Sequence, residues 1–507
     1  MFKNFAGFSV LEKIQKDKHE KRKRQLPTKL IKILVITIIS IVVAMLPTES
    51  FGIAGLTDVH QRIISLFVFA ALMWLTEAMP SWVTSMIVVT VMLFTVSTSA
   101  FSFLRPEGDA ANGLVPFKSI MACFANPTIM LFIGGFVLAI GLTKVKLDVA
   151  LARFLLKPFG TRSEIVLLGF ILVTAIFSAF VSNTATAAMM LAFLTPVLRS
   201  LPADGKGRIA LALAIPVGAN LGGMMTPIGT PPNMIALDYL ASIGMGISFV
   251  DWTIKMAPFV LLLLVLSWML LRVLFPFKQK NIEIKIEGDI EWNFQTWSVV
   301  AAFAVTIFMW MFGTDLWGVD TNVVAMLPIA IFCATGILTR RDLEEINWSV
   351  LWMVAGGFAL GVALNYSGQI KVDGETVNLP SLSNLIVGSV PFGEFSPIAV
   401  MILAGLICFG FSNFISHSAA TSLLVPVLGV VAVGMSDALA AVGGAQAMLV
   451  GIAIASSVSM ILPISTPPNA IAHSTGFIDQ KDMMKVGIIV GLLGLLLGYL
   501  MLIFIGF

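Results

Sequence analysis

Charged residues are scarce in this chain of 507 residues, and their scarcity excludes an ordinary soluble domain. Asp, Glu, Lys and Arg make up 12% of the sequence, whereas 58% is hydrophobic. Soluble domains carry about a quarter charged residues. Apolar runs long enough to cross a bilayer recur from residue 30 onward. We therefore expect an all-α polytopic membrane protein, because a helix satisfies its own backbone hydrogen bonds in lipid and the short alternating strands of a barrel are missing from the sequence.

Cysteine is equally rare. Cys123, Cys333 and Cys408 are scattered in or beside apolar segments, and they form no CxxC pair or metal-ligand spacing. We interpret them as structural thiols and expect no redox or metal centre built on them. A cleavable signal peptide is not expected either, because the first 29 residues are polar and basic.

The order of apolar and polar segments predicts a duplicated architecture. Residues 1–29 are predicted to be a cytoplasmic basic arm that lies on the lipid bilayer, which makes nucleic acid a poor partner. About 11 transmembrane helices and two re-entrant hairpins follow. The predicted parts are scaffold helices 30–125, a first repeat 126–276 with hairpin 164–198 and broken helix 209–240, a cytoplasmic loop 277–292, and a second repeat 293–507 with hairpin 397–431 and broken helix 440–473.

The distribution of positive charge supports this topology. If neither hairpin crosses the membrane, the cytoplasmic loops contain most of the Lys and Arg residues, as the positive-inside rule requires. Only Arg105, Lys118 and Lys371 then fall in the outside loops. We expect a plasma (inner) membrane protein with its N-terminus in the cytoplasm and its C-terminus outside. The two halves are then inverted relative to each other, with the first hairpin opening from the cytoplasm and the second from outside.

Two pairs of polar motifs recur 234 to 236 residues apart. Ser182-Asn183-Thr184 precedes Gly229-Thr230-Pro231-Pro232-Asn233, and Ser416-His417-Ser418 precedes Ser465-Thr466-Pro467-Pro468-Asn469. A single such segment is equally consistent with a proline kink in a membrane helix. Two copies, each paired with a polar hairpin tip, are typical of transporters that bind their substrate at interrupted helices near the bilayer midplane.

The chemistry at these motifs is uncharged. Asp, Glu, Lys and Arg are absent from residues 165–198, 209–237, 397–436 and 439–472. A solute held there meets hydroxyls, amides, one imidazole and backbone dipoles. Helix N-termini favour carboxylates, and exposed carbonyls favour small cations.

The duplicated Ser-Asn-Thr and Gly-Thr-Pro-Pro-Asn pattern resembles the divalent anion/sodium symporter family of dicarboxylate and citrate transporters. The resemblance covers residues 30–507. It implies a homodimer in which an elevator-type transport domain moves against a scaffold, and it implies a di- or tricarboxylate substrate. The substrate-binding residues implied by the motif are Ser182, Asn183, Thr184, Gly229, Thr230, Ser416, His417, Ser418, Ser465, Thr466 and Pro467.

One position departs from the family pattern. In sodium-coupled members each hairpin asparagine helps to build a sodium site, and the resemblance implies one such Na+ site at Ser178, Ser182, Asn183 and Gly229. In the second hairpin His417 replaces the asparagine and Ser418 the threonine. An imidazole offers at most one acceptor nitrogen and repels sodium when it is protonated. We therefore expect that Na+ is not required and that no other cofactor is needed.

These inferences predict an alternating-access exchanger of C4 or C5 dicarboxylates such as succinate, malate or 2-oxoglutarate. A sodium-coupled dicarboxylate symporter is the alternative. An intramembrane hydrolase built on Ser416 and His417 is disfavoured, because chain neighbours rarely face each other and no third residue orients the histidine. We therefore expect no enzymatic activity. A channel is disfavoured because paired, closed half-sites suit alternating access better than a continuous pore.

Overall fold

The computed structural model describes residues 28–106, 113–202, 205–282, 290–372, 375–391 and 395–506. The predicted basic arm therefore falls almost wholly outside the described residues, as does part of the loop 277–292. The described chain is helical throughout, except for one β-hairpin in which β1 (Gln369–Val372) pairs antiparallel with β2 (Glu375–Asn378). This fold confirms the predicted all-α membrane class, apart from the hairpin, which sequence reasoning did not predict.

The first half begins with the apolar helix Thr28–Met45. It continues with α2 (Asp58–Thr76), α3 (Ser81–Thr95), α4 (Phe117–Ala122), α5 (Pro127–Lys144), α6 (Leu147–Leu156), α7 (Ser163–Phe180), α8 (Asn183–Ser200), α9 (Gly207–Gly222), α10 (Pro231–Ser242) and α11 (Phe249–Leu274). Short 3-10 turns lie at Thr48–Phe51, Ser102–Leu104, Cys123–Ala125, Lys157–Phe159 and Gly223–Met225. The predicted hairpin 164–198 corresponds to α7 and α8, and the broken helix 209–240 to α9 and α10.

The second half contains α12 (Phe294–Trp317), α13 (Thr321–Val324), α14 (Met326–Ala334), α15 (Arg340–Glu345), α16 (Trp348–Asn365), α17 (Leu382–Ser389), α18 (Pro397–Phe414), α19 (His417–Gly434), α20 (Ser436–Leu439), α21 (Gly444–Ser457), α22 (Pro467–Ser474) and α23 (Gln480–Phe504). The predicted hairpin 397–431 corresponds to α18 and α19. The predicted broken helix 440–473 has an additional bend of 70° before α21, at Gly443.

Eleven described helices are long and apolar enough to cross a membrane, or up to 12 if the bent pair before α21 is one span. The number of candidate spans agrees with the prediction, but the helices counted are not all the ones that the sequence predicts to be spans. Three of the eleven, α7, α18 and α19, belong to the predicted hairpins. Conversely, the spans that the sequence predicts at 82–99 and 322–338 correspond to shorter helices, α3 and α13–α14.

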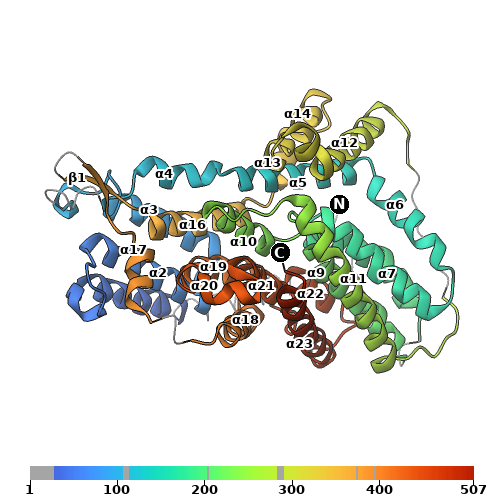
Figure 1. Ribbon diagram of the computed structural model, residues 1–507. Helices are drawn as coiled ribbons and strands as arrows, with labels where there is room; N and C mark the ends of the chain where they lie inside the picture. Colours follow the sequence, from blue (N-terminus) through green and yellow to red (C-terminus); the bar gives the residue numbers. More distant parts are fainter. Residues whose placement is uncertain are drawn as a thin grey trace.

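The matching helices of the two repeats, α5 and α16, pack in equivalent ways. α5 contacts α13 and α14, whereas α16 contacts α3, so each of them lies against a helix from the opposite half. Figure 1 shows α12, α13 and α14 gathered at one edge of the molecule beside α5. Gly134 permits the close approach on α5, because a Cβ there would collide with the backbone of Ala325. Gly356 does the same on α16 against Ser85. Both glycines begin a Gly-Gly-Phe triplet, at residues 134–136 and 356–358, so this repeated triplet marks two equivalent helix crossings.

One expected span was wrong in extent. The apolar run 128–156 suggested one long helix, but α5 ends at Lys144 and α6 begins at Leu147. Lys146 between them has a φ of 54°, a left-handed conformation that interrupts the helix. Three charged residues, Lys144, Lys146 and Asp148, lie at the break, and apolar residues resume after them.

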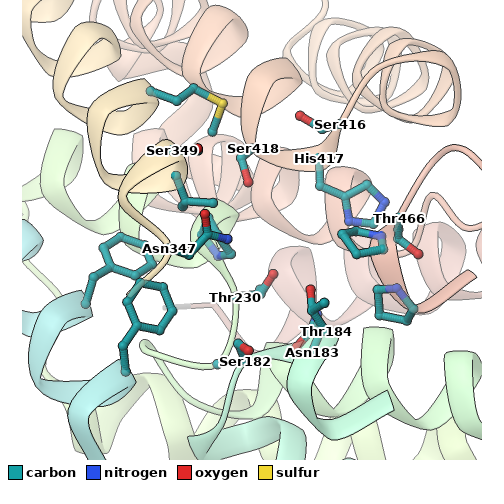
Figure 2. A pocket seen from close by; sticks show the side chains of 18 of the residues that line it. Ser182, Asn183, Thr184, Thr230, Asn347, Ser349, Ser416, His417, Ser418 and Thr466 are labelled. Carbon is teal, nitrogen blue, oxygen red and sulfur yellow. The ribbon is translucent and has the colours of Figure 1, made fainter. Parts of the chain in front are cut away.

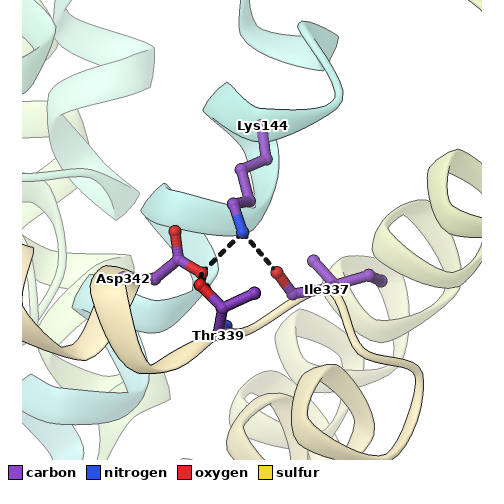
Figure 3. A network of polar contacts seen from close by, with 4 residues as sticks. All are labelled: Lys144, Ile337, Thr339 and Asp342. Carbon is purple, nitrogen blue, oxygen red and sulfur yellow. Dashed lines mark hydrogen bonds and ion pairs between the residues drawn. The ribbon is translucent and has the colours of Figure 1, made fainter.

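The end of α5 is fixed to the loop before α15 by a compact polar network (Figure 3). Lys144 Nζ lies 2.5 Å from Asp342 Oδ2 and donates to the carbonyl of Ile337 at 2.7 Å. The backbone N–H and hydroxyl of Thr339 donate to the same carboxylate oxygen, at 2.6 and 2.5 Å. Burial acts to raise the pKa of Asp342, but the hydrogen bonds from Lys144 and Thr339 outweigh it and hold that pKa below its usual value.

Asp342→Ala is expected to lower the free energy of unfolding by about 1–2 kcal/mol, because it leaves the donors of Lys144 and Thr339 without their shared acceptor. The native pKa of Asp342 is depressed, so its contribution is complete above the unfolded value of about 4 and is lost as pH falls through the folded pKa. The melting temperatures of wild type and variant in detergent should therefore differ at pH 7 and converge in acid.

Glu344→Ala is the matched control for this network. Glu344 pairs with Arg340 at 3.7 Å on the surface, with the two side chains 69% and 94% exposed. Such exposed pairs contribute little. A loss of stability equal to that of Asp342→Ala would show that the buried network is unimportant.

Candidate functional site

Both hairpin tips place the start of a helix at the point where the sequence predicts the site. At the first tip, Ser182 caps α8 by accepting a hydrogen bond from the backbone N–H of Ala185 at 3.3 Å. At the second tip, Ser416 caps α19 in the same way, through Ala419 at 3.3 Å. The two tips are therefore equivalent N-capped turns, as serine at the N-cap position favours.

The two broken helices are held open by equivalent asparagines. Asn233 Nδ2 donates to the carbonyls of Gly223 at 3.1 Å and Thr226 at 2.8 Å. Asn469 Nδ2 donates to the carbonyls of Met460 at 2.9 Å and Leu462 at 3.1 Å. The prolines that follow each threonine occupy the first turn of α10 and α22, where a missing N–H costs no hydrogen bond. In each break, these carbonyls are thus hydrogen-bonded within the protein.

The four motifs surround one cavity of about 310 Å³. All eleven residues that the sequence nominates for substrate line it, as Figure 2 shows for the labelled members. Ser416, His417 and Ser418 lie on one side, and Ser182, Asn183 and Thr184 lie across from them, with Thr230 between. Segments more than 200 residues apart in sequence therefore meet at one site. Their role in binding substrate stays a prediction.

A second group of lining residues escaped sequence reasoning. Two of them, Phe180 and Asn220, lie in the first hairpin and the first broken helix. The others lie outside the hairpins and breaks and include Ser81, Trp82, Phe132, Phe136, Asn347, Ser349 and Met353. A signal was present for two of them, since Asn347 and Ser349 repeat the pattern of Asn126 and Thr128. The aromatic residues carried no signal, because an apolar side chain at a cavity and one in lipid have the same composition.

The electrostatics of the cavity come from backbone dipoles. No Asp, Glu, Lys or Arg side chain is among its lining residues in the described part of the chain. Instead the first residues of α8, α10, α19 and α22 all line it. The N-termini of α8 and α19 have unpaired N–H groups, whereas α10 and α22 begin with two prolines and contribute only the partial positive charge of a helix N-terminus, about half a unit. Four convergent N-termini, two from each repeat, create a site that favours a compact anion.

The first candidate cation site brings together oxygen atoms. Ser178 Oγ lies 2.6 Å from Asn183 Oδ1 and 2.7 Å from the carbonyl oxygen of Ala219. Gly223 packs directly on the Asn183 amide, and Gly229 packs on Gly223. Hydroxyl, amide and main-chain carbonyl oxygens are suitable sodium ligands, so these residues fit the predicted ion. Ser182 contributes its side chain as the helix cap described above.

The corresponding place in the second repeat contains a ring. His417 is 8% exposed, and its Nε2 lies 2.5 Å from the carbonyl oxygen of Ser459. Ser412, which corresponds to Ser178, donates to Ser456 at 3.2 Å, and Ser456 in turn donates to the carbonyl of His417 at 2.9 Å. These hydroxyls and the carbonyl are hydrogen-bonded inside the protein, as the Ser178 hydroxyl is in the first repeat, so the difference between the two places is the imidazole of His417 where the first repeat has the amide of Asn183.

Gly223→Ala is expected to reduce uptake of a labelled dicarboxylate at least tenfold. The added Cβ would lie 2.6 Å from Asn183 Oδ1, so the amide at the hairpin tip must move. Gly410→Ala in α18 is the control, because a Cβ there meets no atom within 4 Å. Uptake assays in proteoliposomes with matched protein content would test this, and equal uptake by the two variants would contradict the close packing at Asn183.

Known proteins identify the group to which this chain belongs. Residues 71–451 match the family described as citrate transporter. An uncharacterized transporter of Haemophilus influenzae is 30% identical over 477 residues, covering 91% of this chain and 93% of that protein. The sodium-dependent dicarboxylate transporter SdcS of Staphylococcus saprophyticus is 26% identical, covering 89% and 87% of the two chains.

A solved structure supports the fold alone. The YdaH transporter of Alcanivorax borkumensis, described as having an unusual topology, superposes with a TM-score of 0.52 at 12% identity, over 87% of this chain and 98% of that one. The family match extends over most of the chain, and it includes the first hairpin, the first broken helix and the second hairpin. This protein belongs to the citrate transporter family and is a membrane transporter resembling the divalent anion/sodium symporters.

Proposed function

We propose that this protein exchanges C4 or C5 dicarboxylates, such as succinate, malate or 2-oxoglutarate, across the membrane by alternating access. Three observations support a dicarboxylate. The cavity of about 310 Å³ lies at the small end of the usual range for ligand sites, roughly 300–1,000 Å³. Helix N-termini reach it from both repeats, which provides one set of donors for each carboxylate. The SdcS relatives are named as dicarboxylate transporters.

The contact between His417 and Ser459 carries the proposal of exchange without sodium. A carbonyl oxygen only accepts, so Nε2 must carry a proton to bond with Ser459 at 2.5 Å. The imidazole thus occupies a carbonyl oxygen that would otherwise be free to bind a cation. The other ring nitrogen, Nδ1, can donate to a substrate carboxylate only when the ring is protonated. His417, neutral or protonated, would then stand in for the coupled ion at this position.

Sodium-coupled symport is the second candidate function. The cluster of Ser178, Asn183 and the Ala219 carbonyl in the first repeat supports it, because these oxygens suit one sodium ion. The sodium dependence in the name of the SdcS relatives supports it as well. The two candidate functions differ in whether the second repeat also binds an ion. His417 lies at the place in that repeat where the ion would bind.

We also propose which helices move during transport and which form a fixed scaffold. The hairpins and broken helices, α7–α10 and α18–α22, form the proposed transport domain, and α2–α5 and α12–α16 form the proposed scaffold. The cavity is lined by both groups, as an elevator-type movement of one against the other requires. A homodimer in the plasma membrane, with a cytoplasmic N-terminus and an outside C-terminus, completes the proposal and rests on the family resemblance and on loop charge.

Counterflow in proteoliposomes tests the function. Vesicles loaded with succinate should take up labelled succinate, malate or 2-oxoglutarate at the same rate with sodium or with choline outside. Empty vesicles should take up much less, because exchange needs a substrate on both sides. A strict requirement for sodium would instead establish the symport alternative, and the absence of uptake with every dicarboxylate would refute both.

His417→Asn is expected to make uptake sodium-dependent. The shorter amide leaves the Ser459 carbonyl without its imidazole donor and restores the hairpin residue that sodium-coupled relatives use. We expect at least a fivefold difference between sodium and choline in the variant. Ser267→Ala controls for the loss of a buried polar group, because it removes a buried hydroxyl in α11 whose hydrogen-bond partner among the described residues is the Leu263 carbonyl. Continued sodium independence of His417→Asn would show that the ring does not replace an ion.

A further inference from the structure

Asn220 connects the two broken helices at the centre of the molecule. It lies near the end of α9 in the first repeat, is 1% exposed, and also lines the cavity. Its Nδ2 donates to Thr466 Oγ1 at 3.2 Å and to Asn469 Oδ1 at 3.0 Å, both in the second repeat. Sequence reasoning gave this residue no role, because it lies outside the duplicated motifs.

The orientation of the Asn220 amide follows from its surroundings. Asn469 Nδ2 faces the carbonyls of Met460 and Leu462, which only accept, so the Asn469 oxygen must be the atom that faces Asn220. Asn220 must therefore present its NH₂ group there. Its own oxygen, Oδ1, is buried and has no hydrogen-bond partner among the described residues. The two donated bonds are accordingly the only described hydrogen bonds of this side chain.

These bonds determine what the hydroxyl of Thr466 can do. Its oxygen accepts from Asn220 Nδ2 at 3.2 Å and from the backbone N–H of Asn469, as the cap of α22, also at 3.2 Å. A hydroxyl has two acceptor lone pairs and one proton to donate. Both lone pairs are engaged, and no described residue accepts the proton. Thr466 lines the cavity, so its remaining capacity is a single hydrogen-bond donor for a ligand there.

The equivalent threonine of the first repeat is not fixed in this way. Thr230 begins α10 without a side-chain cap hydrogen bond. The residue that corresponds to Asn220 in the second repeat is Ser456, whose hydroxyl donates to the carbonyl of His417 at 2.9 Å. The two repeats therefore differ at this position. The Thr466 hydroxyl is held in place as a hydrogen-bond donor, whereas the Thr230 hydroxyl can rotate.

We propose that Asn220 is a positioning residue that holds the Thr466 hydroxyl as a dedicated hydrogen-bond donor to one substrate carboxylate. This inference rests on the proposed dicarboxylate function. The Thr466 half of the site is the fixed anchor for that carboxylate. The Thr230 half, whose hydroxyl both donates and accepts, adjusts to the position of the second carboxylate. Such a division accommodates dicarboxylates of different length without moving the anchor.

A double-mutant cycle on KM for labelled succinate counterflow tests the proposal. Thr466→Val removes the donor, and we expect KM to rise about tenfold, the usual consequence of losing a hydrogen bond to a charged group. Asn220→Ala lets the hydroxyl rotate, and KM should rise about fivefold. Because Asn220 acts through Thr466, the double variant should have a KM within about twofold of Thr466→Val alone.

Controls separate this role from a purely structural one. Ser267→Ala, remote from the cavity, should keep the wild-type KM, and each variant should elute as folded protein with a melting temperature recorded without substrate. If Asn220→Ala does not fold, Asn220→Leu takes its place in the cycle, because it keeps a similar size, removes the donor and adds no charge to the cavity.

Two results would overturn the inference while the proposed function stands. One is a double variant whose KM rises by the product of the single effects, about fiftyfold, which would mean that the two residues act independently. The other is a folded Asn220 variant with an unchanged KM. Failure of the wild type itself to exchange any dicarboxylate would instead refute the proposed function, and the inference with it.

Discussion

The structure depends on pairing the backbone groups that a broken helix leaves open inside a membrane. Lipid supplies no hydrogen bonds, so each freed carbonyl must find a donor in the protein. Asn233 and Asn469 provide these donors, one for each repeat, by bonding to the carbonyls of the break that precedes them. Once the breaks are fixed, the helices that follow begin at the cavity. The anion-favouring N-termini are therefore a consequence of the way the chain satisfies its own backbone.

The two repeats share this frame but differ in the groups placed on it. The first repeat has an oxygen-rich cluster around Ser178 and Asn183, whereas the second has the His417 imidazole against the carbonyl of Ser459. Asn220 adds a further difference by crossing from one repeat to the other. Symmetry thus sets the position of the half-sites, and single substitutions at equivalent positions set their chemistry. A duplicated transporter can specialise one half in this manner without changing the other.

The helices α3, α5 and α16 supply the remaining wall of the cavity. Close crossings at Gly134 and Gly356 bring α5 and α16 against their neighbours, and the Lys144 network fixes the end of α5. The lining aromatics Phe132 and Phe136 belong to α5, so the crossing at Gly134 also locates the apolar surface that faces a ligand. A site built mostly from uncharged groups needs such rigid support, because individual neutral hydrogen bonds contribute little unless their geometry is maintained.

The sequence alone determined the membrane class, the inverted duplication and the residues of the four motifs, because hydropathy, loop charge and the positions of proline and serine are local properties. Which helices are full spans could not be predicted in this way. The hairpin helices α7, α18 and α19 are as long as crossing helices, and it is the position of the two hairpin tips at the cavity that distinguishes them. The break after Lys144, the aromatic wall and the hydrogen bonds of Asn220 were decided by the tertiary structure. Each depends on contacts between segments far apart in the chain, and composition and periodicity carry no record of such contacts.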